Sequence, residues 1–253
     1  MYLVSFLLLP VVIIFVKSAT VFTFKIWLIV CLSASVHFLY TLTLSAAYDK
    51  GDLSLVYPLA RSAPLFVMLG GVIVLKEIPS VTGFVGIILT VGGAYIIGLK
   101  SMRIKEIVKP IVLLTNRAYQ LPLFTAIITA AYSIIDRIGV SLIDPFAFIV
   151  LLLCLEALLF TPFVLWKRSN VIIAEWRENN KNIILAGLAR FVSYLLILYV
   201  MLDTQLSYVV AVRQISIVLA VITGSMILKE ENARTRMIGA LGILAGVIVI
   251  GAN

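Results

Sequence analysis

The sequence predicts an all-α integral membrane protein with about nine transmembrane helices. Three observations support this fold class. Apolar residues make up 62% of the 253 positions and charged residues only 13%, and the mean hydropathy is +1.16, so a soluble domain could not bury the apolar surface. Apolar runs long enough to cross a bilayer recur almost without interruption. These runs do not alternate apolar with polar residues, as the strands of an outer-membrane barrel would.

Each predicted helix corresponds to one apolar run. A hydrocarbon core about 30 Å thick requires roughly 20 apolar residues per helix. The first run differs from a signal peptide because no basic segment precedes it and further spans follow at once. Little chain remains for a soluble domain. The predicted spans are 3–17, 26–47, 53–75, 81–98, 122–142, 146–166, 183–202, 207–228 and 236–252.

The net charge of +8 reflects basic residues in the loops between spans. Because these residues do not gather on one soluble face, we expect no binding of nucleic acid. Loops that follow even-numbered spans hold thirteen Lys and Arg residues, whereas loops that follow odd-numbered spans hold three. The positive-inside rule therefore predicts that the even-numbered loops are cytoplasmic.

An internal repeat appears when the sequence is shifted by 153 residues. Leu75-Lys76-Glu77 then falls on Leu228-Lys229-Glu230, and four glycines of 71–98 fall on glycines of the second copy. The alignment contains no gap and gives twelve identities over positions 53–98. Apolar composition alone would give scattered Leu and Ile matches, so the pattern indicates a duplication.

The repeat predicts two halves of opposite orientation. Five spans separate each residue from its mate, so the second copy enters the membrane from the other side. Inverted repeats of this kind are typical of secondary transporters. We expect a first repeat at 1–98, a basic linker at 99–121 and a second repeat at 122–253. The mate of the span at 122–142 would precede Met1, so the first repeat lacks its first helix here. For the linker, a surface helix and a solvated segment both remain open.

Several segments resemble the EamA family of the drug/metabolite transporter superfamily. The resemblance lies in Ala47–Arg61, Leu75–Glu77, Gly83–Gly86 and Gly92–Gly93, and in Ala131–Val140 for the second repeat. It implies a fold of ten helices in two inverted five-helix repeats that carries small metabolites across the cytoplasmic membrane. The family also implies a cytoplasmic C-terminus, whereas the loop charges place the C-terminus outside.

Ionisable residues at membrane depth are the best functional candidates, because each costs about 2.5–3.5 kcal/mol to insert. Tyr57 and Arg61, Tyr132 and Asp136, and Arg190 and Tyr194 are each four residues apart, so each pair shares a helix face. An excess of arginines over carboxylates favours an amino acid or organic anion as substrate. The substrate-binding candidates are His37, Tyr40, Tyr57, Arg61, Tyr132, Asp136, Arg190, Tyr194 and Arg213, and Glu156 is the candidate coupling residue. The alternative is that these charges pair with each other, for example Asp136 with an arginine, and only hold helices together.

Two further sequence features concern the helices themselves. Pro58 lies within a predicted span, where it could break the helix near Tyr57–Arg61 and expose backbone to a substrate, or only kink it. The spaced glycines, including Gly242 and Gly246, allow close helix contact. They favour packing within the chain and leave a homodimer open.

Other function classes find less support. The sequence has no Gly-x-Ser-x-Gly, His-Glu-x-x-His or phosphate-binding Gly-Lys-Ser/Thr motif, and it has one histidine. We therefore expect no enzyme, no cofactor and no metal site. A lipid flippase and a non-transporting scaffold remain alternatives to a transporter. The expected partners are a small-molecule substrate and the lipid bilayer.

Overall fold

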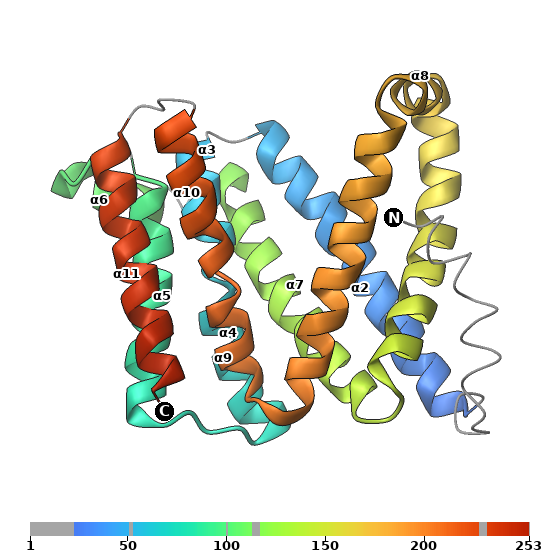
Figure 1. Ribbon diagram of the computed structural model, residues 1–253, viewed down its shortest axis with the longest axis horizontal. Coiled ribbons are helices and arrows are strands. Elements are labelled where there is room, and N and C mark those ends of the chain that lie inside the picture. The colour runs from blue at the N-terminus through green and yellow to red at the C-terminus, as the bar shows by residue number, and fades with distance from the viewer. Residues whose placement is uncertain (1–22, 51–52, 100, 113–116, 228–231, 253) are drawn as a thin grey trace. The chain divides into compact units, whose positions relative to one another are not determined.

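The computed structural model describes residues 23–50, 53–99, 101–112, 117–227 and 232–252, and these residues form helices and no strands (Figure 1). The predicted span at 3–17 and the Leu228–Glu230 motif lie outside the described residues. The helices are α2 (Phe24–Lys50), α3 (Leu53–Ala60), α4 (Ala63–Gly70), the π-helix η2 (Gly71–Leu75), α5 (Val81–Ile97), α6 (Ile104–Val112), α7 (Arg117–Val140), α8 (Pro145–Asp203), α9 (Leu206–Val212), α10 (Ile215–Ile227) and α11 (Ala233–Gly251).

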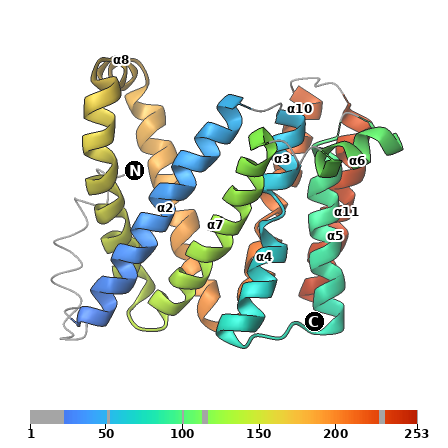
Figure 2. The ribbon, with the colours of Figure 1, turned by 180° about the vertical axis from the view of Figure 1, so that it is seen from behind.

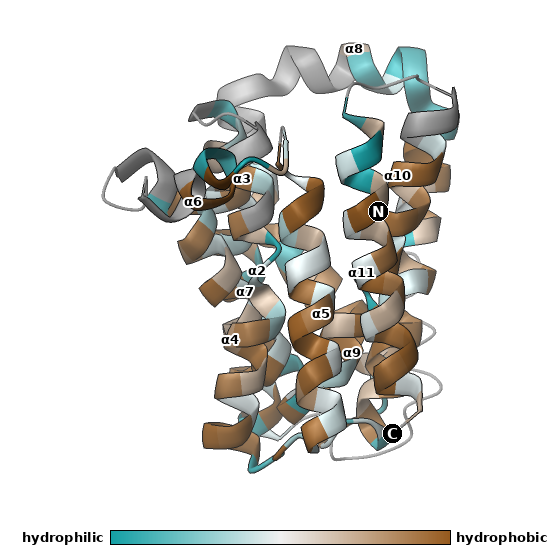
Figure 3. Ribbon diagram, turned by 90° about the vertical axis from the view of Figure 1, so that its left-hand side faces the viewer, coloured by the Kyte–Doolittle hydropathy of each residue, from teal (hydrophilic) through white to brown (hydrophobic). Residues whose placement is uncertain are grey.

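Six helical stretches of the described residues are long and apolar enough to cross a membrane, and 63–75 and 81–97 form shorter apolar helices. Each predicted span from residue 26 onward overlaps one of these eight stretches, although only 63–75 of the predicted span 53–75 is matched. Figure 3 shows α5 and α11 coloured mainly as hydrophobic. Their exposed side chains include Ile88, Leu241 and Ile248, which suit lipid better than water. The chain is therefore a multi-pass α-helical membrane protein.

The predicted spans at 146–166 and 183–202 correspond to two separate candidate membrane spans, but the segment that connects them is helical and not an irregular loop. Helix α8 contains 59 residues and would be about 90 Å long if straight, which exceeds the thickness of a bilayer. Figures 1 and 2 show that it turns back on itself instead. Residues 163–186 contain no glycine or proline, so nothing in their sequence terminates the helix.

The predicted spans at 53–75 and 207–228 are both interrupted. Helix α3 ends at Ala60 and α4 begins at Ala63, so the break predicted after Pro58 is confirmed at residues 61–62. Helix α9 ends at Val212 and α10 begins at Ile215, which gives a second break at 213–214. The mate of Pro58 under the 153-residue shift is Ala211, so this second break has no proline signal.

The described residues divide into two compact units. One contains 23–39 and 135–203, and the other contains 40–134 and 204–252 apart from its gaps. Helices α2 and α7 each continue from one unit into the other. The first unit thus holds most of α8, and the second holds α3 to α6 and α9 to α11.

Helices α5 and α11 lie side by side in the second unit (Figures 1 and 2). A Cβ atom added to Gly93 would lie 2.5 Å from the carbonyl oxygen of Gly239, and one added to Gly239 would lie 2.5 Å from that of Gly93. Gly86 and Gly246 face each other in the same way, with Cβ-to-oxygen distances of 2.9 and 2.6 Å. The two backbones therefore touch, and the predicted packing role is confirmed for Gly86, Gly93 and Gly246 but not for Gly92, which has no atom within 4 Å of an added Cβ.

The predicted linker contains a surface helix, α6. The hydroxyl of Tyr95 in α5 donates a hydrogen bond of 2.5 Å to the carbonyl oxygen of Ile107 in α6. Exposed side chains such as Ile104 and Lys105 occur along α6. Of the two alternatives for 99–121, residues 104–112 follow the helical one.

Candidate functional site

A buried polar cluster occupies the first unit. The side chain of Asp136 in α7 has no exposed surface. The hydroxyls of Ser33 in α2 and Tyr194 in α8 each donate a short hydrogen bond to its carboxylate. Nε2 of His37 lies 3.0 Å from Oδ2 of Asp136. Three helices thus bring polar groups to one carboxylate at membrane depth.

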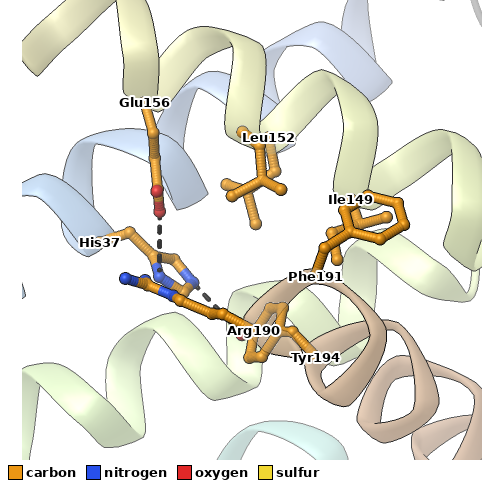
Figure 4. A pocket seen from close by; sticks show the side chains of 8 residues that line it. His37, Ile149, Leu152, Glu156, Arg190, Phe191 and Tyr194 are labelled. Atoms are coloured by element: carbon orange, nitrogen blue, oxygen red, sulfur yellow. Dashed lines mark hydrogen bonds and ion pairs between the residues drawn. The ribbon is translucent and has the colours of Figure 1, made fainter. Parts of the chain in front are cut away.

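The imidazole of His37 lies between the carboxyl groups of Asp136 and Glu156, and Figure 4 shows the Glu156 side of this arrangement. Its Nδ1 atom is 3.2 Å from Oε1 of Glu156 in α8, while its Nε2 atom faces Asp136. The relative exposure of His37 is 5% and that of Glu156 is 2%, so water does not screen the contacts. Because each ring nitrogen faces an oxygen, each contact needs one hydrogen atom between the two atoms.

A small cavity adjoins this cluster. Its volume is about 20 Å³, which is room for about one water molecule. The polar residues that line it are His37, Glu156, Arg190 and Tyr194, and the remaining walls are apolar. His37 and Arg190 are mates under the 153-residue shift, so both predicted repeats contribute to this cavity.

A larger cavity lies in the second unit, where α3 and α9 are interrupted. Its volume is about 130 Å³, which is room for about four water molecules at roughly 30 Å³ each, or for a small solute. Arg61 and Arg213, from the two helix breaks, both line it. No Asp or Glu is among the described residues that line it. The lining residues are Tyr40, Leu44, Tyr48, Ala60, Arg61, Ala63, Thr125, Thr129, Tyr132, Val210, Arg213, Gln214 and Ser216.

Aromatic rings and an amide position the groups of this cavity. The guanidinium carbon of Arg61 lies 5.2 Å from the ring centroid of Tyr57, within range of a cation–π interaction. The rings of Tyr40 and Tyr132 meet edge to face with their centroids 5.3 Å apart. Nε2 of Gln214 donates a hydrogen bond of 3.1 Å to the carbonyl oxygen of Arg61. Gln214 is the mate of Arg61 under the shift, so the two breaks are joined directly.

The structure gathers the predicted site residues into two places. His37, Asp136, Glu156, Arg190 and Tyr194 lie in or beside the cluster of the first unit. Four of the other five candidates line the cavity of the second unit, namely Tyr40, Arg61, Tyr132 and Arg213, and the fifth, Tyr57, stacks on Arg61. What these residues bind stays a prediction.

Sequence reasoning missed several polar residues and named one wrong partner. Asp136 bonds to His37 and two hydroxyls, whereas an arginine was the partner suggested for it. Ser33 and Gln214 were not predicted because neither side chain is ionisable. Ser33 could have been found because it lies four residues before His37 and so shares its helix face. Gln214 could have been found because it directly follows Arg213. Among the described residues, no group of three His, Cys, Asp or Glu side chains could hold a metal ion.

Comparison with known families gives one match. The model of the EamA-like transporter family matches residues 116–252, which include nearly all of the predicted second repeat. A search of curated proteins found no match.

Proposed function

Since the chain belongs to the EamA-like transporter family, we propose that it is a secondary transporter that moves a small carboxylate-bearing metabolite, such as an amino acid or organic anion, across the cytoplasmic membrane. The cavity of about 130 Å³ with two arginines and no acidic lining residue carries this proposal. Its substrate would bind at membrane depth and be released by alternating access.

Arginine chemistry supports a carboxylate substrate. A guanidinium presents several N–H donors in a plane and can bind both oxygens of a carboxylate. Two such groups in one cavity create a positive potential that an anion would neutralise. The tyrosine rings and the Thr125 and Thr129 side chains add apolar faces and hydroxyls around it.

Two glycine contacts that the 153-residue shift exchanges support two inverted repeats. Gly86 packs against Gly246 and Gly93 packs against Gly239, and the 153-residue shift exchanges these two contacts. The helix breaks at 61–62 and 213–214 also correspond within one residue. A transporter can face either side of the membrane by exchanging the conformations of two such halves.

The test is exchange of labelled solute in proteoliposomes. Liposomes loaded with unlabelled glutamate, succinate or glycine would be offered the same labelled compound at equal pH on both sides. Arg61→Ala and Arg213→Ala should each raise the solute concentration that gives half-maximal exchange by about 10- to 100-fold. Each substitution removes hydrogen bonds to a charged group, which are worth about 1.5–3 kcal/mol. Arg61→Lys should recover only part of the loss, since a lysine keeps the charge without the planar donors.

Arg103→Ala is the matched control, because Arg103 is exposed and does not line the cavity. It should exchange solute like the unsubstituted protein. Size-exclusion profiles in detergent would show that all variants fold. Unchanged exchange by both cavity variants would contradict the proposal. Transfer of labelled lipid between the leaflets, together with no exchange of any tested solute, would favour a flippase.

A further inference from the structure

Two carboxyl groups contact the imidazole of His37, although one would be enough to hold the ring in place. Asp136 and Glu156 approach the two nitrogens of one imidazole at 3.0 and 3.2 Å, and both carboxyl groups are almost fully buried. Two buried carboxylates are costly at membrane depth even with a cation between them. A pair of carboxyl groups around a histidine is, however, well suited to gaining and losing a proton.

The hydrogen atoms in the cluster can be counted. The two contacts need two hydrogens, which an imidazolium between two carboxylates supplies at a net charge of −1. A neutral imidazole beside one protonated carboxyl group has the same two hydrogens and the same net charge. One further proton gives an imidazolium, one carboxylate and one carboxylic acid, with a net charge of 0. The cluster thus changes between −1 and 0 without losing either contact.

The extra proton has a preferred position. Asp136 already accepts hydrogen bonds from the hydroxyls of Ser33 and Tyr194, so fewer of its oxygen lone pairs remain for a further proton. Glu156 lines the cavity of about 20 Å³ beside the cluster, where a water molecule could deliver a proton to it. The second oxygen of Glu156 is therefore the position for this proton.

The groups that face His37 come from all three helices packed around it. They are Ser33 on α2, Asp136 on α7, and Glu156, Arg190 and Tyr194 on α8. Arg190 lines the same cavity as Glu156. The guanidinium of Arg137 bonds at 3.0 Å to the carbonyl oxygen of Leu202.

On these contacts we propose that the Asp136–His37–Glu156 cluster is a proton-binding site that couples solute transport to a pH gradient, an inference that rests on the proposed function. A proton fits better than sodium, because the imidazole fills the space between the carboxyl groups and the adjoining cavity holds about one water molecule. Helix α2 carries Tyr40 three residues after His37, and α7 carries Tyr132 four residues before Asp136. Both tyrosines line the cavity of about 130 Å³ that contains Arg61 and Arg213. The helices that carry His37 and Asp136 therefore also line the proposed solute site.

The decisive variant is Glu156→Gln, which keeps the size of the side chain and cannot ionise. In proteoliposomes, the measured quantity is the ratio of solute uptake with an imposed pH difference to uptake without one. For the unsubstituted protein, one coupled proton per solute changes this ratio by up to about tenfold per unit of pH. For Glu156→Gln the ratio should fall to one.

Glu175→Gln on the exposed part of α8 is the matched control, since it changes the same chemistry outside the cluster. Its ratio should equal that of the unsubstituted protein. A ligand-free measurement keeps the inference testable if Glu156→Gln transports poorly. Infrared difference spectra of purified protein between alkaline and acidic buffer should show a protonated carboxyl band that disappears in Glu156→Gln and remains in Glu175→Gln.

The measurements distinguish a failure of this inference from a failure of the proposed function. Solute exchange at equal pH together with a ratio of one in the unsubstituted protein would overturn proton coupling and leave the transporter intact. A Glu156→Gln variant with an unchanged ratio and an unchanged carboxyl band would also overturn it. Absence of exchange for every solute would refute the proposed function itself.

Discussion

The contact between α5 and α11 gives a sharp prediction for Gly93→Ala. A Cβ atom on residue 93 would lie 2.5 Å from the carbonyl oxygen of Gly239 and 2.6 Å from the amide nitrogen of Ile243. Both obstacles are backbone atoms of the partner helix, so no side chain can rotate away to make room. The neighbouring Gly92 has no atom within 4 Å of the same position. The two adjacent glycines therefore differ only in what they face.

The magnitude follows from two opposing terms. Alanine in place of glycine stabilises a helix interior by about 1 kcal/mol, and this gain is common to both positions. Overpacking costs about 1–3 kcal/mol and applies to Gly93→Ala alone. The difference between the two variants isolates the packing cost. We expect about 2 kcal/mol or more, because backbone must move.

Thermal unfolding of purified protein in one detergent measures this difference. Gly92→Ala should melt at or slightly above the temperature of the unsubstituted protein. Gly93→Ala should melt below Gly92→Ala by about 4–8 °C for 2 kcal/mol in a chain of this size. Equal melting temperatures for the two variants would refute the close backbone contact between α5 and α11.

Two further predictions concern single hydrogen bonds. Oε2 of Glu77 accepts a bond of 2.7 Å from the amide of Leu206 at the start of α9, so Glu77→Gln should lower stability by about 0.5–2 kcal/mol, and an unchanged melting temperature would exclude this capping role. Tyr194→Phe removes a hydroxyl that donates to Asp136 and should cost about 1.5–3 kcal/mol in the same assay. Tyr199→Phe, whose hydroxyl lies 3.4 Å from an exposed carboxylate on the surface, should change stability by no more than about 0.5 kcal/mol, and an equal effect of both tyrosine variants would contradict the special position of Tyr194.

The parts of the fold that could be predicted from the sequence depend on local properties. The run of apolar residues at 26–47 corresponds to α2 because length and composition decide membrane insertion. Pro58 indicated a break or a kink in this span because proline lacks the N–H that would bond to residue 54, and the helix in fact continues to Ala60 before it breaks. The break after Val212 had no such signal, since Ala211 is compatible with a helix. The turn in α8 likewise lacks a local breaker between residues 163 and 186.

Candidate residues could be predicted from the sequence more readily than their partners. Charge at membrane depth identified His37, Asp136 and Glu156, because such residues need a specific environment. Their pairing could not be predicted, since His37 and Asp136 are 99 residues apart and meet only after folding. The placement of Arg61 and Arg213 in a cavity with no acidic lining residue could not be predicted either. In the sequence, the excess of intramembrane arginines over carboxylates indicated an anionic substrate only weakly. The cavity lined by Arg61 and Arg213 without an acidic residue supports an anionic substrate directly.

The proposed duplication explains why the two arginines share one cavity. A broken helix leaves carbonyl groups without intrahelical partners, and such groups are costly inside a membrane unless another donor reaches them. The carbonyl oxygen of Arg61 accepts the amide of Gln214, its own mate, and the carbonyl oxygen of Arg213 accepts the hydroxyl of Ser216 at 3.0 Å. The break in one repeat thus contributes a donor to the break in the other. Because each break also carries an arginine, joining the breaks brings both guanidinium groups to the same cavity, where a single carboxylate could bind both.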